Sequence, residues 1–231
     1  AISAAIMLYG FALMYGATGT FVLSEMSEVF ATQRLVDGQV SLFGQIGLLL
    51  AILGLCYKIA AAPMPLYAPD VYQGAASPVT AFLAFVPKAA GMISIIILCS
   101  LVGWEWEGGL PKSIKMTLWV VAVLTMLLGN IGALLQTSAK RMLGYSSIAH
   151  SGYMLIGVIA GPPYGLVAVL VYLVIYGATN TAAFATLAGL SVDGEPVDSL
   201  EDFSGMYRRS PTAAATMAIS CGSLLGIPPL F

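Results

Sequence analysis

The sequence predicts an all-α fold, a polytopic bundle of transmembrane helices, on three observations. Apolar residues make up 59% of the chain and charged residues only 9%, and the mean hydropathy of +0.92 is far above that of a water-soluble domain. Several runs of roughly 20 apolar residues follow one another, which is the length that a helix needs to cross a bilayer. No stretch alternates apolar and polar residues as the strands of a membrane barrel do. We therefore expect a single membrane domain over residues 1–231, as part of a longer chain.

Seven apolar runs are predicted to form helices, in chain order. They cover residues 1–23, 40–62, 78–103, 116–135, 146–160, 165–190 and 211–231. The fifth run is short for a span, so we expect it to extend backward over residues 143–145, with a tilt or a thinner local bilayer covering the remainder. Charged and turn-forming residues gather between the runs, and there we predict water-exposed loops: 24–39, 104–115, 161–164 and 191–210.

Lys58 is the only charged residue between Ser41 and Pro69, a stretch that would be about 43 Å long as one straight helix and is too long for a simple span. Pro63 and Pro65 follow Lys58, and each removes a backbone donor, so we predict that the helix breaks there and leaves carbonyl groups unpaired. Broken helices at membrane depth recur beside the coupling-ion sites of transporters. Lys58 is therefore a candidate for proton transfer, and the alternative is a lysine that snorkels from a helix end.

Lys88 lies deep inside the third run, residues 78–103, which contains no other charged residue. A charged ammonium costs about 2.5–3.5 kcal/mol at the centre of a membrane helix, so we expect Lys88 to face a polar interior and a partner. Burial disfavours the charged form of a lysine, whereas a nearby carboxylate favours it. An amine poised between these states can accept and release a proton, which makes Lys88 a candidate site. The alternative is a purely structural buried lysine.

His150 is the only histidine of the chain, and Ser146 and Tyr153 lie at helical spacing on the same face of the fifth run. A lone histidine on such a face is often a packing residue. An imidazole also suits proton transfer near neutral pH, and hydroxyl neighbours can orient it. His150 is therefore a third candidate, with packing as an equally weighted alternative.

Other kinds of site have no support in the sequence. The net charge of −2 leaves no basic stripe for nucleic acid. The three cysteines lie far apart in apolar runs without paired spacing, so we predict small apolar side chains rather than metal ligands or a disulfide. Because no catalytic triad, zinc spacing, phosphate loop or dinucleotide fingerprint is present, no metal, cofactor or redox site is expected on this chain.

Five motifs follow one another at set distances along the chain. They are YKIAAAP (57–63), APDVYQGA (68–75), PVTAF (78–82), KAAG (88–91) and KRMLGYSSIAHSGY (140–153). Together they closely resemble the antiporter-like subunit N family of bacterial respiratory complex I, over nearly the whole chain.

The resemblance implies an antiporter-like inverted-repeat fold, of which this chain supplies roughly the sixth to eleventh helices. It implies that the run 40–62 and the segment to Tyr72 form one broken helix, and that Lys58 and Lys88 belong to the proton path. The family commonly has Pro-x-His-x-Trp after the first of these lysines, whereas this chain has Pro65 in place of the histidine and Tyr67 in place of the tryptophan. The family's buried glutamate and a later lysine lie outside this chain.

The resemblance also implies a proton-translocating subunit of an NADH-quinone oxidoreductase, multi-pass in the bacterial plasma membrane. Its partners would be other membrane-arm and hydrophilic subunits, which would hold the nicotinamide, flavin, iron–sulfur and quinone sites. The alternatives are a cation/proton antiporter subunit of the same superfamily and a non-conducting membrane scaffold whose lysines merely pair with acids. The Lys-Arg-Met-Leu-Gly-Tyr-Ser-Ser-Ile and Pro-Asp-Val-Tyr segments favour the first of these functions over the antiporter.

Overall fold

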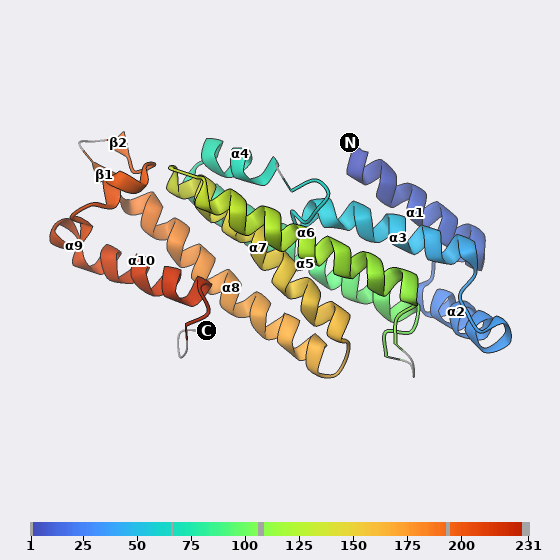
Figure 1. The fold of residues 1–231 in the computed structure, drawn as a ribbon. Helices are drawn as coiled ribbons and strands as arrows, with labels where there is room; N and C mark the ends of the chain where they lie inside the picture. Colours follow the sequence, from blue (N-terminus) through green and yellow to red (C-terminus); the bar gives the residue numbers. More distant parts are fainter. Residues whose placement is uncertain (1, 66, 106–108, 193–194, 228–231) are drawn as a thin grey trace.

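The computed structural model describes residues 2–65, 67–105, 109–192 and 195–227, which form an elongated bundle of helices (Figure 1). The helices are α1 (Ile2–Thr18), α2 (Leu23–Asp37), α3 (Leu42–Lys58), α4 (Tyr67–Gly74), α5 (Ser77–Leu101), α6 (Lys112–Leu134), α7 (Ala139–Ala160), α8 (Tyr164–Gly189), α9 (Met206–Arg209) and α10 (Pro211–Leu224). Between α8 and α9 lie the short antiparallel strands β1 (Ser191–Val192) and β2 (Glu195–Pro196), and a 3-10 turn at Leu200–Phe203.

Each of the seven predicted runs contains a helix, which confirms the all-α membrane fold. By length and composition α5, α6 and α8 can each cross a membrane, and α1 with α2 would make a fourth span as a pair bent by 60°. The apolar helix α3 has only 17 residues because it is one half of a broken helix. The last part of the seventh run, 228–231, lies outside the described residues.

The helix α7, which contains the fifth predicted apolar run, is longer than that run. α7 begins at Ala139, before the expected start at residue 143, and has 22 residues. The hydroxyl of Ser138 caps it by accepting from the backbone N–H of Arg141. Arg141 forms an ion pair of 2.7 Å with Asp70 in α4. The polar first turn, which hid the start of the helix from a hydropathy reading, thus ties α7 to α4.

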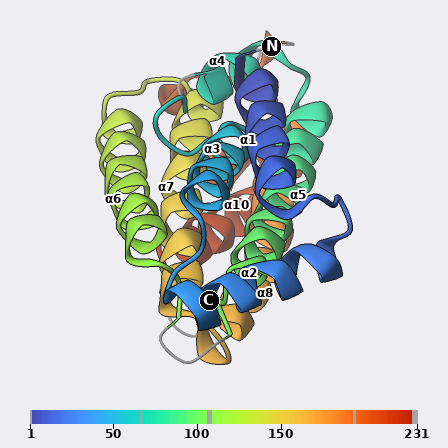
Figure 2. The same cartoon turned by 90° about the vertical axis from the view of Figure 1, so that its right-hand side faces the viewer.

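The prediction of a loop over residues 24–39 is wrong, because nearly all of this segment belongs to the helix α2. Its charged residues masked the pair Met26 and Phe30, which lie four residues apart and are both buried. Gly38, with φ of 74°, ends the helix in the left-handed conformation. Figure 2 shows α2 lying across one end of the bundle, and its axis is bent by 60° from that of α1. α2 thus lies over this end of the bundle, with its buried pair facing inward.

The predicted broken helix is confirmed, but its break starts earlier than expected. α3 ends at Lys58, before either proline, because Ala60 adopts a left-handed backbone with φ of 56°. The N–H groups of Ala60 and Ala61 then bond back to the carbonyls of Tyr57 and Cys56, at 3.1 and 2.7 Å. This is the Schellman arrangement that usually needs glycine. Pro63 and Pro65 therefore keep the helix from resuming before Tyr67, and they do not end it.

The expectation of unpaired carbonyl groups at the break is wrong for two of them. The hydroxyl of Ser151 in α7 donates to the carbonyl of Ile59 at 2.5 Å. The hydroxyl of Tyr67 donates to the carbonyl of Tyr57 at 2.9 Å. These side chains replace the helical donors that the break removes, as backbone groups at membrane depth require. The break is therefore a fixed, hydrogen-bonded structure.

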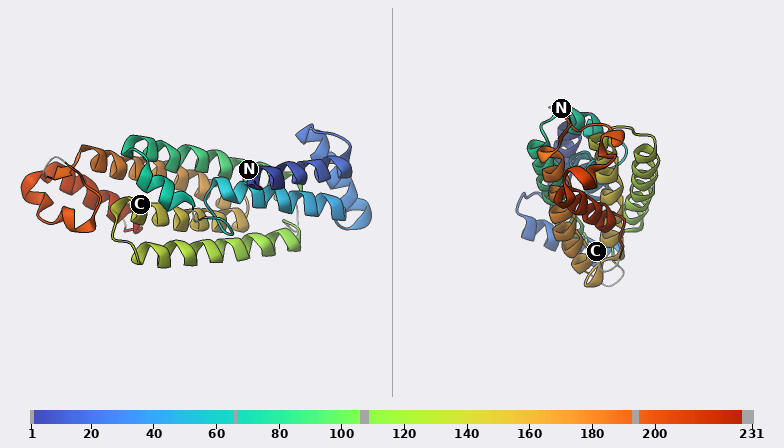
Figure 3. Two further views of the ribbon diagram at one scale, coloured as in Figure 1. Left: turned by 90° about the horizontal axis from the view of Figure 1, so that it is seen from above. Right: turned by 90° about the vertical axis from the view of Figure 1, so that its left-hand side faces the viewer.

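A second helix ends in the same way as α3, in agreement with an inverted-repeat fold. At the end of α10, Gly226 has a φ of 77°, and the N–H groups of Gly226 and Ile227 bond back to Ser223 and Gly222. Two prolines follow in the sequence at 228 and 229. Figures 1 and 3 show α3 entering from one end of the bundle and α10 from the other, so that both helices stop near its middle.

Glycines allow α1 and α3 to pack closely. A β-carbon at Gly47 would lie only 2.8 Å from the carbonyl oxygen of Gly10 and 2.9 Å from the backbone nitrogen of Met14. We expect Gly47→Val to push the helices apart and to cost about 1–3 kcal/mol of stability, measured by thermal denaturation in detergent. Gly16→Val is the matched control, because no atom lies within 4 Å of its β-carbon position. Equal destabilisation by both changes would contradict the close packing.

Candidate functional site

Lys88 lies in the middle of α5 with only 2% of its surface exposed. Its ammonium nitrogen donates to the hydroxyl oxygen of Ser147 at 2.7 Å and also to the backbone carbonyl of Ser147. The same nitrogen lies 3.4 Å from the hydroxyl of Tyr176 and 4.6 Å from the centre of its ring. Lys88 on α5 therefore meets polar groups from α7 and α8.

Ser147 and Tyr176 also bind each other, since the hydroxyl of Tyr176 donates to that of Ser147 at 2.8 Å. We call Lys88, Ser147 and Tyr176 the lysine cluster. Within the described ranges the ion pair present joins Arg141 to Asp70, so no described carboxylate lies in the cluster. Hydroxyl and carbonyl dipoles can solvate either form of an amine without holding it in one form.

Lys58 and Lys88 line the same small cavity, which has a volume of about 80 Å³. Lys58 is exposed on the surface of the chain, whereas Lys88 is buried. In the part of the chain that the structure describes, Lys58 has neither a hydrogen bond nor an ion pair. The cavity can hold a few water molecules, each of which occupies about 30 Å³ in the liquid. Lys58 thus marks its outer side and Lys88 its inner side.

Pro87 gives this cavity a polar wall. It lies inside α5 directly before Lys88, and a proline has no N–H to bond the carbonyl four residues earlier, here that of Leu83. Leu83 and Pro87 both line the cavity. The carbonyl oxygen of Leu83 therefore lacks its normal helical donor beside the space between the two lysines.

His150 is buried in α7, and its Nδ1 lies 2.6 Å from the hydroxyl of Tyr172 in α8. The predicted face is present, because Ser146, His150 and Tyr153 line one pocket of about 670 Å³. The hydrogen-bond partner of the histidine is nevertheless Tyr172 and not either of those two residues. The edge of the pocket also includes the end of α10 at Gly226.

Tyr176 belongs to the lysine cluster and also lies beside the histidine. Its hydroxyl belongs to the cluster, while its ring centre lies 5.1 Å from that of His150. Among the described residues no hydrogen bond runs directly from the cluster to His150. The two groups are thus neighbours that one water molecule or one side-chain rotation can connect.

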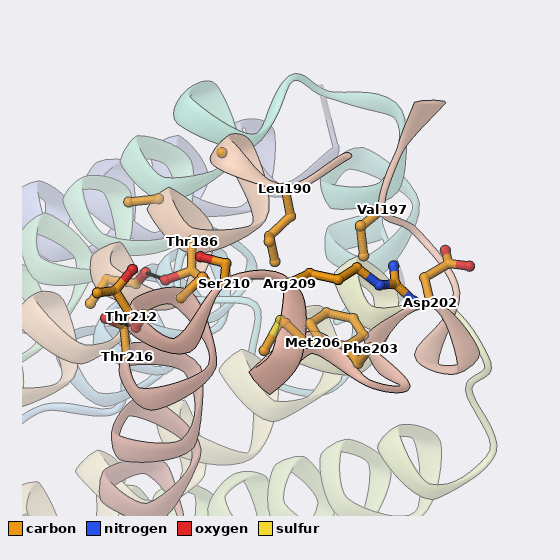
Figure 4. Close-up of a pocket in the computed structure, with 14 residues that line it drawn as sticks. Thr186, Leu190, Val197, Asp202, Phe203, Met206, Arg209, Ser210, Thr212 and Thr216 are labelled. Carbon is orange, nitrogen blue, oxygen red and sulfur yellow. Dashed lines mark hydrogen bonds between the residues drawn. The ribbon is translucent and has the colours of Figure 1, made fainter. Parts of the chain in front are cut away.

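A further pocket, of about 530 Å³, lies at one end of the bundle between α8 and α10 (Figure 4). Arg209 extends across it and donates to the carbonyl of Ser204 at 2.8 Å. Asp202 accepts from the backbone N–H groups of Asp198 and Ser199, as a helix cap does. These charged groups therefore hold the connecting segment in shape, and none of the predicted site residues lines this pocket.

No group of three histidine, cysteine or acidic residues that could hold a metal ion is present in the described ranges. Cys56, Cys99 and Cys221 are free thiols, of which Cys56 and Cys99 are buried and Cys221 is partly exposed. The nicotinamide, flavin, iron–sulfur and quinone sites assigned above to partner chains stay predictions.

Sequence reasoning found the lysines and the histidine but missed their partners. Ser147 stands inside the KRMLGYSSIAHSGY motif, yet its neighbour Ser146 has the same chemistry, and only the rotation of α7 distinguishes them. Tyr176 and Tyr172 lie in an apolar run where tyrosine is common. The available signal was the spacing of Tyr172 and Tyr176, which lie four residues apart and therefore on the same face of a helix.

Comparisons with known proteins place the whole chain in one membrane-protein family. The family model described as NADH:quinone oxidoreductase/Mrp antiporter, TM, matches residues 1–231. NADH-quinone oxidoreductase subunit N 2 of Roseiflexus castenholzii is 40% identical over 96% of this chain and 45% of its own length. The chain thus spans under half the length of the curated relatives it matches.

Two solved structures share the fold. A chain of respiratory complex I from Thermus thermophilus has a TM-score of 0.79 and 34% identity, covering 99% of this chain and 46% of that one. A chain of the Mrp complex from Dietzia sp. has a TM-score of 0.84 and 25% identity, covering 99% and 40%.

Proposed function

The chain belongs to the NADH:quinone oxidoreductase/Mrp antiporter membrane family, and on that premise we propose that it moves protons across a membrane through Lys88. The observation that carries the proposal is a lysine in a spanning helix with 2% exposure and hydroxyl and carbonyl partners. An ionisable group at this depth is costly and marks an ion or proton path.

The proposed path begins at Lys58, on the exposed side of the shared cavity. Water in the cavity, which Leu83 and Pro87 also line, passes the proton to Lys88. The hydroxyls of Ser147 and Tyr176 then accept and donate in turn, because a hydroxyl can do both.

From the lysine cluster the path continues to His150. A water molecule or a rotation of Tyr176 carries the proton over the gap between them. The hydrogen bond between His150 and Tyr172 orients the imidazole, and the 670 Å³ pocket beside it gives the proton an exit.

The proposed setting is the plasma membrane of a bacterium, with the chain as one translocating subunit of an NADH-quinone oxidoreductase. The subunit N relatives support this assignment. Electron transfer would then occur on partner subunits that carry the nicotinamide, flavin, iron–sulfur and quinone sites. The contribution of this chain to the enzyme is translocation.

A cation/proton antiporter subunit is the second candidate, and the similarity to a chain of the Mrp complex favours it. Affinity purification of the full-length protein separates the two functions. Recovery of hydrophilic redox subunits, with NADH-driven acidification of reconstituted vesicles, supports the oxidoreductase. Recovery without redox subunits, with sodium-driven proton movement, supports the antiporter. An assembled complex that moves no protons in either assay would support the remaining alternative, a non-conducting membrane scaffold.

The histidine gives a prediction of moderate size. We expect His150→Gln and Tyr172→Phe each to slow proton translocation about two- to fivefold, because each removes the same oriented hydrogen bond while water can still bridge the gap. The measurement is the initial rate of acidification of vesicles per assembled complex. Tyr164→Phe, at a tyrosine that is 87% exposed, is the control and should retain the wild-type rate. A wild-type rate in both test variants would leave His150 as a packing residue.

A further inference from the structure

Asn180 is a buried polar residue that the proposed path does not use. Only 1% of its surface is exposed, and its amide nitrogen has no hydrogen-bond partner among the described residues. A buried donor without an acceptor is costly, so native proteins usually satisfy it with protein or with ordered water. The side chain therefore points to an occupant that protein atoms do not supply.

The position of Asn180 places that occupant beside the lysine cluster. Asn180 lies one helical turn beyond Tyr176 on the same buried face of α8. α5 and α8 run in opposite directions (Figure 1), with Lys88 next to Tyr176 and Phe85 packed against Gly177. This register puts Asn180 level with the residues of α5 that lie one turn before Lys88.

Two alanines are buried at this level of α5 and α8, and another hydroxyl lies further along α5. Ala84 on α5 and Ala183 on α8 are fully buried there. One turn further along α5, the buried hydroxyl of Thr80 donates to the carbonyls of Ala76 and Tyr72, at 3.2 and 3.4 Å. Its oxygen can still accept a hydrogen bond. A buried water needs about two to four polar partners, and the amide of Asn180 and the hydroxyl of Thr80 can serve as two of them.

We propose that Asn180 holds a buried water molecule between α5 and α8, and that this water extends the lysine cluster by one helical turn toward Thr80. Asn180 is then a positioning residue, which fixes the water that exchanges protons with the cluster. The water site stands on the geometry alone, whereas its part in translocation rests on the proposed function.

The first test is a structure of the assembled complex at a resolution that shows water. We expect a water molecule within hydrogen-bond distance of the amide of Asn180, and we expect Asn180→Leu to lose it. Leucine keeps most of the volume and removes the donor. A wild-type structure without that water, or with a protein acceptor on the amide, would overturn the proposal.

The second test is proton translocation in vesicles. We expect Asn180→Leu to lower the rate per assembled complex about three- to tenfold, and Asn180→Ser, which keeps a donor and leaves room for water, to restore most of it. The control is Thr186→Val on the same helix, because the hydroxyl of Thr186 bonds only the carbonyl of Ala182 in its own helix.

The outcomes separate the two proposals. If Asn180→Leu assembles and translocates at the wild-type rate, the role of the water in transport is wrong. If Asn180→Leu fails to assemble, the water in the wild-type structure still tests the water site, and the rate of Asn180→Ser still tests its role in transport. If Lys88→Met translocates normally while the water is present, the proposed function fails and the water site stands as a structural one.

Discussion

Lys88→Met is expected to leave the complex assembled and to reduce proton translocation at least about tenfold, since a positioned proton-transfer group contributes that much or more. Methionine keeps the length and the apolar stem of lysine but has no titratable group. The change also removes a buried charge that α7 and α8 solvate with only a few dipoles, so folding should not suffer. The measurement is NADH-driven acidification of vesicles per assembled complex.

The matched control for this change is Lys115→Met. Lys115 is exposed near the start of α6, where a lysine reaches water. The Lys115→Met variant should translocate protons at the wild-type rate. Normal translocation by Lys88→Met would show that the buried lysine is structural, whereas loss of assembly would show that its hydrogen bonds are needed for folding.

Ser147→Ala is expected to have the next largest effect, a loss of about five- to tenfold in translocation. The change removes the hydroxyl that binds Lys88 at 2.7 Å and accepts from Tyr176 at 2.8 Å. The backbone carbonyl of residue 147 remains to hold the amine, so the lysine stays in place and keeps only the longer direct contact of 3.4 Å to the Tyr176 hydroxyl. The rate is measured in the same vesicle assay.

The adjacent serine provides the control for Ser147→Ala. Ser146 has the same side chain and lies in the same helix, but it lines the 670 Å³ pocket beside His150 instead of binding Lys88. Ser146→Ala should therefore change the rate by less than about twofold. Equal losses in the two serine variants would mean that the effect comes from α7 as a whole and not from the contact with the lysine.

Most of the fold follows from the sequence because the bilayer leaves few choices. A run of apolar residues of sufficient length favours a helix, and the described part of each of the seven runs contains helix. α2 and the start of α7 were missed for one reason. Charged residues at the end of a bundle can face water while Met26 or Ser138 anchors the backbone, and hydropathy alone does not show such anchors.

The broken helix shows how far local rules reach. Pro63 and Pro65 correctly indicated a break, but the end of α3 is set by the left-handed backbone of Ala60. An alanine in that conformation costs about 1–2 kcal/mol. Tertiary contacts that no local pattern contains maintain it, above all the hydrogen bond from Ser151 to the carbonyl of Ile59.

The candidate site was predictable in part for the same reason. Lys58, Lys88 and His150 stand out because charge and imidazole are rare in apolar runs. Their partners are hydroxyl groups, which are common there, and which of them meet depends on the rotation and register of α5, α7 and α8. The sequence therefore indicates where a proton can be held, and the packing of helices decides where it can go next.

On the proposed path Lys88 releases and regains a proton during each turnover. Infrared difference spectroscopy of the assembled complex, with nitrogen-15 in its lysines, tests this most directly. We expect an isotope-sensitive ammonium band that changes between the resting and the working enzyme and is absent from Lys88→Met. A difference spectrum in which every lysine band is the same for the wild-type protein and Lys88→Met would contradict it.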